Sequence, residues 1–318
     1  MLSNCILFTI SITFSLFVGN FLIPILRSIN AKQSIRKDGP SSHIANKSQT
    51  PTIGGVIFLI PVFFITLILY LTKKDFLTLD LTIVICTTFV MAILGFTDDY
   101  LKVRKKHNKG ISGWTKLLIQ FLVSYSIFYI YKGGGSYFYL LWFFFVIAGA
   151  SNSYNLTDGL DGLLGSITLA SFLGFFVLFY CTGKFELVTF LIIFFGALAG
   201  FLYFNRYPAK VFMGDTGSLA IGGAIGSLAI VSKHELFLIL FAAIPILEAL
   251  SVILQVVSFQ YSKNFLGVDK RLFKMAPLHH HFELIGWKET DIVNRFFIFQ
   301  VICTLIGILL IQLWHKNL

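Results

Sequence analysis

Long runs of hydrophobic residues, separated by short polar connections, follow one another along nearly the whole chain. A helix that crosses a membrane needs about 20 mostly apolar residues. Ten runs of this kind lie at residues 5–26, 53–71, 81–96, 117–131, 138–154, 163–181, 187–204, 217–232, 236–261 and 294–314. Because no connection between them is long enough to bury a core of its own, the pattern predicts a single transmembrane domain over residues 1–318, an all-α integral membrane bundle of about ten helices.

Two of the runs also contain glycines that are four residues apart. The pairs are Gly196 with Gly200 and Gly222 with Gly226. Small residues at this spacing are common where helices approach one another closely inside a membrane. We therefore interpret these glycines as packing sites between helices.

The composition agrees with a membrane protein. Of the 318 residues, 56% are hydrophobic and 13% are charged, so the chain has too little polar surface to cover a soluble globule of its size. A formal net charge of +10 could suggest a nucleic-acid partner. The basic residues, however, lie in short connections beside the apolar runs, as the orientation rule for membrane proteins requires. We expect membrane lipid, and no nucleic acid, around this chain.

The basic residues are divided unequally between alternate connections. Nineteen of the 25 Lys and Arg residues follow the first, third, seventh and ninth runs or open the tenth. Cytoplasmic connections of membrane proteins carry the excess of Lys and Arg. The division predicts that these connections are cytoplasmic and that both termini are extracytoplasmic.

Two acidic clusters lie on the predicted cytoplasmic face. Asp98 and Asp99 are adjacent at the end of the third run; such a pair suits a divalent cation or a base of raised pKa, with a solvated helix end as the alternative. The segment 155–162 holds Asp158 and Asp161 and contains no Lys or Arg. Uncompensated carboxylates at a membrane boundary are costly and usually functional, so we expect this segment to contact a ligand.

Two further polar clusters lie on the same face. Asp215 follows a glycine where a helix is expected to begin, so it suits a metal ligand or an N-cap. The run His279-His280-His281 lies in the last cytoplasmic connection. Neighbouring residues of a helix point about 100° apart, so hydrogen bonding to an anion is favoured over a zinc site, with a surface histidine run as the alternative.

Together these clusters predict a site for a diphosphate. Carboxylates hold a divalent cation, and lysines neutralise the remaining phosphate oxygens. Phosphoryl transfer depends on this kind of positioning and charge stabilisation. The residues concerned are Asp98, Asp99, Asp158, Asp161 and Asp215, beside Lys47, Lys102, Lys116 and the three histidines.

Five segments carry a resemblance to a known family. They are Thr50–Gly55, Asp98–Asp99, Asn155–Gly162, Phe212–Ser218 and Met275–Glu283. With these segments, nearly the whole chain resembles the polyprenyl-phosphate N-acetylhexosamine-1-phosphate transferases. The last segment is the most specific, and it is similar to the branch that uses UDP-MurNAc-pentapeptide rather than UDP-N-acetylglucosamine.

The resemblance implies a Mg²⁺-dependent phosphoglycosyl transferase in the bacterial plasma (inner) membrane, with its active-site cleft on the cytoplasmic side. Such an enzyme transfers phospho-MurNAc-pentapeptide from UDP-MurNAc-pentapeptide to undecaprenyl phosphate, which gives lipid I and UMP for peptidoglycan biosynthesis. The resemblance leaves open whether the transfer takes one step or two, and whether the protein is a homodimer.

Individual roles also follow from the resemblance. It implies Mg²⁺ on Asp215, uridine stacking on Phe212 and recognition of the uracil edge by Leu160 with Asp161. The residues implied in catalysis are Asp98, Asp99, Lys102, Lys116, Asp215 and His279. Those implied in substrate binding are Lys47, Thr52, Asn155, Asp158, Leu160, Asp161, Asn205, Phe212, His280 and His281.

Other functions remain as alternatives at this point. Transfer of N-acetylglucosamine phosphate is an alternative within the family, while an anion transporter or a structural scaffold would be a different class of membrane protein. Glu248 lies inside the ninth run, where an unpaired charge is expensive, so it serves either a lipid groove or a hydrogen bond between helices. Pro245 is expected to interrupt the same run.

Overall fold

The computed structural model describes residues 2–29, 31, 50–73, 76–105, 110–267, 269 and 271–316, and these contain helices and no β-strand. The all-α fold predicted from the hydrophobic runs is confirmed. The helices are α1 (Leu2–Ser28), α3 (Val56–Thr72), α4 (Leu79–Lys105), α5 (Gly113–Lys132), α6 (Tyr137–Thr157), α7 (Leu163–Cys181), α8 (Phe185–Asn205), α9 (Gly214–Ser232), η1 (Glu235–Phe237), α10 (Leu238–Phe241), α11 (Ala243–Leu266), α12 (Leu278–Leu284) and α13 (Glu289–Lys316).

Most of the long helices are suited to a membrane. Within the described ranges, seven of them are long and apolar enough to cross one, namely α1, α4, α7, α8, α9, α11 and α13. Helix α3 is apolar but shorter. The chain is therefore a multi-pass membrane protein, and the number of ten spans stays a prediction.

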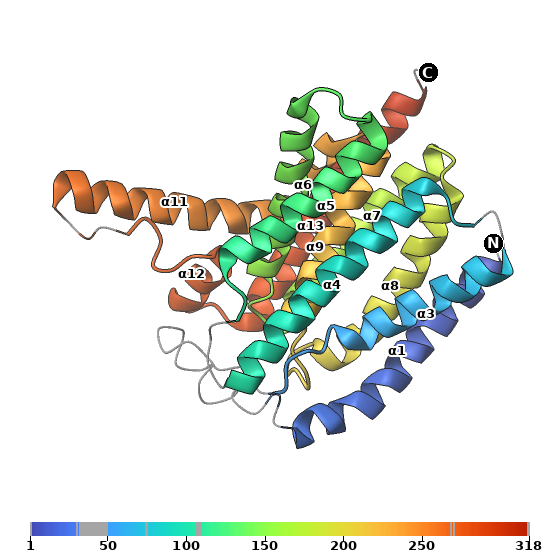
Figure 1. Ribbon diagram of the computed structural model, residues 1–318. Coiled ribbons are helices and arrows are strands. Elements are labelled where there is room, and N and C mark those ends of the chain that lie inside the picture. Colours follow the sequence, from blue (N-terminus) through green and yellow to red (C-terminus); the bar gives the residue numbers. More distant parts are fainter. Residues whose placement is uncertain are drawn as a thin grey trace.

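Helix α9 lies at the centre of the bundle, in contact with α4 and α6 (Figure 1). Nearly all its residues are buried, although many of them are glycine, alanine or serine. A Cβ on Gly222 would come within 2.5 Å of the Ser151 Cα on α6, and one on Gly200 within 2.8 Å of the Ile12 carbonyl on α1. The glycine pairs therefore do allow close helix packing, as predicted.

The ninth hydrophobic run, expected over 236–261, is not one helix. It is broken at Ala242 into η1, α10 and α11, and a side chain of α13 satisfies the backbone at the break. Gln300 accepts a hydrogen bond from the Ile244 N–H (3.0 Å) and donates one to the Leu240 carbonyl (3.0 Å). Pro245 lies in the first turn of α11, where its missing N–H has no helical partner to lose.

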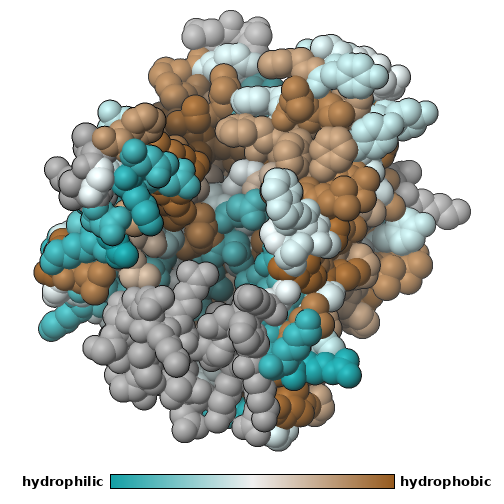
Figure 2. Space-filling view, turned by 60° about the vertical axis from the view of Figure 1, so that its left-hand side comes forward, coloured by the Kyte–Doolittle hydropathy of each residue, from teal (hydrophilic) through white to brown (hydrophobic). Residues whose placement is uncertain are grey.

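After this break, α11 projects sideways from the other helices, with α12 close to it (Figure 1). Many of its side chains are exposed hydrophobics, among them Leu250, Ile253, Leu254 and Val257. Apolar side chains exposed on several sides of a helix are typical of contact with lipid. The face that Figure 2 turns forward is hollowed near its centre, and hydrophilic surface lies inside the hollow.

The ends of several helices come together at one end of the bundle. The C-terminal end of α4 meets the start of α5 through Asp98 and Lys116 (3.1 Å). The start of α9 meets the end of α6 through Asp215 and Asn155 (3.2 Å). Residues from four helices are thus assembled into one polar cluster.

Candidate active site

The cluster is built on two carboxylates that share two ammonium groups. Lys102 lies 2.5 Å from Asp98 Oδ2 and 3.2 Å from Asp215 Oδ1. Lys116 lies 3.1 Å from Asp98 Oδ1 and 2.6 Å from Asp215 Oδ2. Because the carboxylates lie close together and away from bulk water, the two positive charges offset a repulsion that would otherwise be large.

Asp98 belongs to this cluster because of its position on α4. Lys102 is one helical turn further along the same helix, so its side chain reaches back to Asp98. The Ile111 N–H also donates to Asp98 Oδ1 (2.7 Å). A Cβ on Gly110 would overlap the Asp98 carboxylate, so the chain can pass this close only because residue 110 is glycine.

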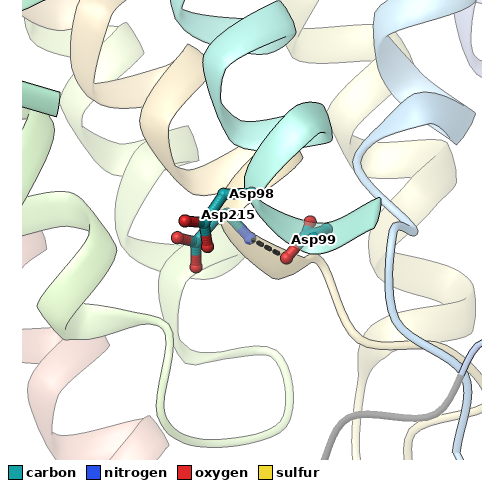
Figure 3. A group of neighbouring side chains, drawn as sticks. All are labelled: Asp98, Asp99 and Asp215. Atoms are coloured by element: carbon teal, nitrogen blue, oxygen red, sulfur yellow. Dashed lines mark hydrogen bonds between the residues drawn. The ribbon is translucent and has the colours of Figure 1, made fainter. Parts of the chain in front are cut away.

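Asp99, the next residue, has a different task. Its Oδ2 accepts hydrogen bonds from the Thr216 N–H (2.9 Å) and hydroxyl (2.7 Å), and its Oδ1 accepts one from the Asp215 N–H (3.2 Å). Figure 3 shows Asp98 and Asp215 side by side, with Asp99 apart from them and bonded to the main-chain nitrogen of Asp215. Asp99 thus caps the start of α9 from α4, since the first N–H groups of a helix have no partner within it.

The start of α9 is placed by two glycines. Gly214 has φ +72°, a conformation that other residues rarely adopt, and a Cβ there would come within 2.5 Å of Asp99 Oδ2. A Cβ on Gly95 of α4 would overlap the Asp215 carbonyl. The aspartates meet because these positions have no side chain.

The end of α6 adds an amide and a carboxyl group. Asn155 donates to Asp215 Oδ1 (3.2 Å) and to the Ser218 hydroxyl (2.8 Å). Asp158 lies just beyond the helix, where burial and then the negative charges of Asp215 and Asp99 raise its pKa to about 8. A carboxyl group with such a pKa titrates near neutral pH, which is a property of functional sites.

The chemistry of the donors fits a divalent cation. Asp98, Asp99 and Asp215 each offer a carboxylate oxygen within 4.8 Å of the others. Oxygen ligands of this kind are those that Mg²⁺ prefers. The oxygens of Asp99 accept hydrogen bonds from the start of α9. Asp98 and Asp215, whose charges are met by lysine ammonium groups instead, are therefore the better ligands.

His279 is buried beside the same site. It lies in the first turn of α12 (Leu278–Leu284), and both its backbone nitrogen and its Nδ1 lie 3.2 Å from Glu248 Oε1 on α11. A Cβ on Gly159 would overlap His279 Nε2, so the ring lies directly against the segment 155–162. Of the two roles that the sequence left open for Glu248, the hydrogen bond between helices is the one observed.

Other predicted substrate-binding residues hold the segment 155–162 in place. Asn205 accepts a hydrogen bond from the Gly162 N–H (3.2 Å) and donates to the Val211 carbonyl (3.0 Å). Asp161 accepts one from the Ala209 N–H (2.9 Å). The side chain of Leu160 packs in a hydrophobic cluster with residues of α7, α11 and α13.

Thr52 and Phe212 lie next to the start of α9. The Phe212 N–H donates to the Pro51 carbonyl (2.8 Å), and the Gly54 N–H donates to the Phe212 carbonyl (2.8 Å). These bonds place the buried Thr52 hydroxyl against Gly214. The segment 50–55 is thereby joined to the residues that precede Asp215.

The remaining two histidines mainly organise their own segment. His280 Nδ1 lies 2.9 Å from Glu283 Oε2, and His281 Nδ1 accepts the Lys274 N–H (3.2 Å). Neither bond involves the aspartate cluster. Lys47, the predicted uridine-pocket lysine, lies outside the described residues.

Two contributors to the site were not expected from the sequence. Glu289, at the start of α13, accepts a hydrogen bond from the Asp161 N–H (2.6 Å). The Ile111 N–H supports Asp98 from a segment with no distinctive motif. Both act through tertiary contacts with backbone groups, and a sequence pattern carries no signal for such contacts.

Comparison with known proteins gives the class and then the family. The model of a family described as Glycosyl transferase family 4 matches residues 81–233, which include all three carboxylates of the cluster. The chain is 40% identical to the phospho-N-acetylmuramoyl-pentapeptide-transferase of Bacillus velezensis over 335 residues, 99% of this chain and 100% of the relative. It is also 40% identical to the proteins of that name from Bacillus subtilis and Bacillus pumilus, each over 332 residues, with the same coverage. The chain therefore belongs to the phospho-N-acetylmuramoyl-pentapeptide-transferase family.

Proposed function

We propose that this protein transfers phospho-MurNAc-pentapeptide from UDP-MurNAc-pentapeptide to undecaprenyl phosphate, which gives lipid I and UMP in peptidoglycan biosynthesis. The name of its full-length relatives, phospho-N-acetylmuramoyl-pentapeptide-transferase, supports this choice of transferred group. The single structural observation that carries the proposal is the pair of carboxylates, Asp98 and Asp215, bridged by Lys102 and Lys116. A diphosphate needs a site of this kind, with both a set of cation-binding oxygens and lysine ammonium groups beside it.

In this reaction an oxygen of the lipid phosphate attacks the phosphorus attached to the sugar, and the bond from that phosphorus to UMP breaks. Asp98 receives the proton of the lipid phosphate. Little basicity is required, because a phosphate monoester already ionises near pH 6. Lys102 and Lys116 are free to turn from the carboxylates to the phosphate oxygens when substrate binds, and they stabilise the negative charge that develops there.

The cofactor in this proposal is Mg²⁺, held by Asp215 with Asp98 beside it. When bound, the ion would neutralise diphosphate oxygens and stabilise the departing UMP. Asp99 supports this arrangement indirectly, since its bonds to the Asp215 and Thr216 N–H groups fix the start of α9. Asn155 orients the Asp215 carboxylate through its bond to Oδ1.

The nucleotide is assigned to the segment 155–162, through Leu160 and Asp161, together with the neighbouring Asn205 and Phe212. This part of the protein borders the aspartates. The hydrogen bonds that hold this segment leave it one preformed shape, which lowers the cost of ordering it around a ligand. The site faces the cytoplasm in this proposal, because most Lys and Arg residues lie in connections at this end. Both termini are then extracytoplasmic, in the bacterial plasma membrane.

Incubation of the purified protein in detergent with undecaprenyl phosphate and Mg²⁺ tests the function. UDP-MurNAc-pentapeptide is expected to yield UMP and a labelled lipid, whereas UDP-N-acetylglucosamine is expected to yield neither. The opposite preference would assign the chain to transfer of N-acetylglucosamine phosphate. Flux of an anionic solute across sealed vesicles with no UMP from either sugar would indicate a transporter and overturn the proposal.

A further inference from the structure

Glu248 and His279 form a buried polar pair between α11 and α12. Glu248 is fully buried and His279 is 1% exposed. One carboxylate oxygen, Oε1, lies 3.2 Å from the backbone nitrogen of His279 and 3.2 Å from its Nδ1. Because a carboxylate oxygen accepts, both nitrogens of His279 act as donors in these contacts. A single side chain of another helix thus contacts His279 at both its backbone and its imidazole.

The other ring nitrogen is left for something else. His279 Nε2 is buried, and it has no hydrogen-bond partner among the described residues. A buried polar nitrogen without a partner costs free energy, so its persistence calls for an explanation such as a ligand. The ring lies against Gly159, directly after Asp158 in the segment that borders the aspartate cluster, so a group bound at that cluster is the nearest candidate partner.

We propose that Glu248 is a positioning residue for His279 and presents Nε2 to a phosphate oxygen of the sugar nucleotide. The inference rests on the proposed function and adds to it. In the substrate complex the ring is protonated on both nitrogens, with Nδ1–H on Glu248 and Nε2–H on the phosphate. A carboxylate, an imidazolium and a phosphate then alternate in charge, so each charge lies beside one of opposite sign.

A purely structural role for Glu248 makes different predictions. If the bond only fastened α12 to α11, its loss would lower thermal stability, and its effect on turnover would not depend on His279. A positioning role acts through the imidazole, so the effect of changing Glu248 must disappear once the imidazole is gone. A double-mutant cycle therefore separates the two roles.

The test compares wild type, Glu248→Gln, His279→Gln and the double variant, with kcat, KM for UDP-MurNAc-pentapeptide and Tm measured in detergent. Glu248→Gln keeps the shape and an acceptor oxygen but removes the charge. We expect its kcat to fall about 10- to 100-fold, as for other partners that orient a functional histidine, with Tm near that of wild type. The double variant is expected to turn over no more slowly than His279→Gln alone.

Glu186→Gln is the matched control. Glu186 is a partly buried glutamate that, like Glu248, accepts a hydrogen bond, here from the Thr78 hydroxyl (3.1 Å), but it lies at the first turn of α8, the opposite end of that helix from Asn205. Its kcat is expected to match that of wild type. If Glu248→Gln showed no thermal transition, Glu248→Asp would replace it in the test. Aspartate keeps the charge but moves the carboxylate away from His279. The same fall in kcat, at a wild-type Tm, is expected.

Wild-type kcat in Glu248→Gln, or losses that multiply in the double variant, would overturn the inference while leaving the transferase function intact. Failure of the function itself looks different. In that case wild type and Glu186→Gln would both release no UMP, and the inference would fall with it.

Discussion

Asp98 and Asp215 come from opposite ends of the matched family segment, yet their carboxylates are bridged twice, once by Lys102 and once by Lys116. Two negative and two positive side chains thus form a closed cluster with no net charge. Such a cluster is stable without substrate and ready for it, since each ammonium group can move from a carboxylate to a phosphate oxygen. Replacement of either an acidic or a basic residue of this cluster should therefore affect both turnover and stability.

Replacement of Asp215 by asparagine removes the ligand assigned to Mg²⁺. We expect UMP release to fall by about 10²- to 10³-fold or more, the usual cost of losing one group that stabilises transition-state charge. The matched control is Asp291→Asn, a change at an exposed aspartate in the first turn of α13. Turnover assays on both variants check the assignment, which wild-type activity in Asp215→Asn would refute.

Replacement of Lys116 by methionine leaves two close carboxylates with one ammonium group. Without divalent ions its Tm should lie below that of wild type, because the repulsion between Asp98 and Asp215 is no longer offset. Added Mg²⁺ should raise the Tm of Lys116→Met more than that of wild type, since the ion meets less competition for the carboxylates. Thermal unfolding across a Mg²⁺ titration measures this, and equal shifts would mean that the ion binds elsewhere.

Asp99→Asn should behave as a stability variant more than Asp98→Asn does. Asp99 accepts three hydrogen bonds at the start of α9, and a side-chain cap contributes about 0.5–2 kcal/mol. An asparagine amide would turn a donor toward groups that also donate. A lower Tm for Asp99→Asn than for Asp98→Asn in the same detergent is expected, and the reverse order would contradict the capping role.

The contrast between these adjacent aspartates shows how far sequence reasoning extends. The hydrophobic runs and the alternation of charged connections were enough to predict an all-helical membrane protein and to place Asp98, Asp158 and Asp215 on one face. They could not separate the roles of Asp98 and Asp99, because those depend on which side of α4 meets α9. The interruption of the ninth run near Pro245 was predicted, but its place at Ala242 was not, since the side chain that satisfies the backbone there, Gln300, comes from another helix.

Asp158 makes stability depend on pH. Its pKa is 3.8 in an unperturbed carboxyl group and about 8 in the folded protein. Between these values the folded state binds the extra proton, so stability falls as pH rises from about 4 to about 8. The Tm advantage of Asp158→Asn over wild type in metal-free buffer should therefore grow over this range and then level off. A difference in Tm that does not change with pH would contradict the raised pKa.

Gly159→Ala tests the contact between the segment 155–162 and His279 by adding one methyl group. The backbone of Gly159 has no positive φ, so alanine meets no conformational barrier there. The methyl group would overlap His279 Nε2, however, and the buried ring cannot move without breaking its bonds to Glu248. Displacement by about 1 Å typically costs about 10²-fold in rate, so we expect a fall of that order in kcat.

The control for this change is Gly149→Ala on α6. A Cβ on Gly149 meets no atom within 4 Å, and alanine is favoured over glycine inside a helix by about 1 kcal/mol. Gly149→Ala should thus keep wild-type turnover with an equal or higher Tm, while Gly159→Ala loses turnover. Because the two glycines lie ten positions apart, in the helix and in the segment that follows it, a general intolerance of α6 to methyl groups would reduce both. Only contact with the histidine ring reduces one and spares the other.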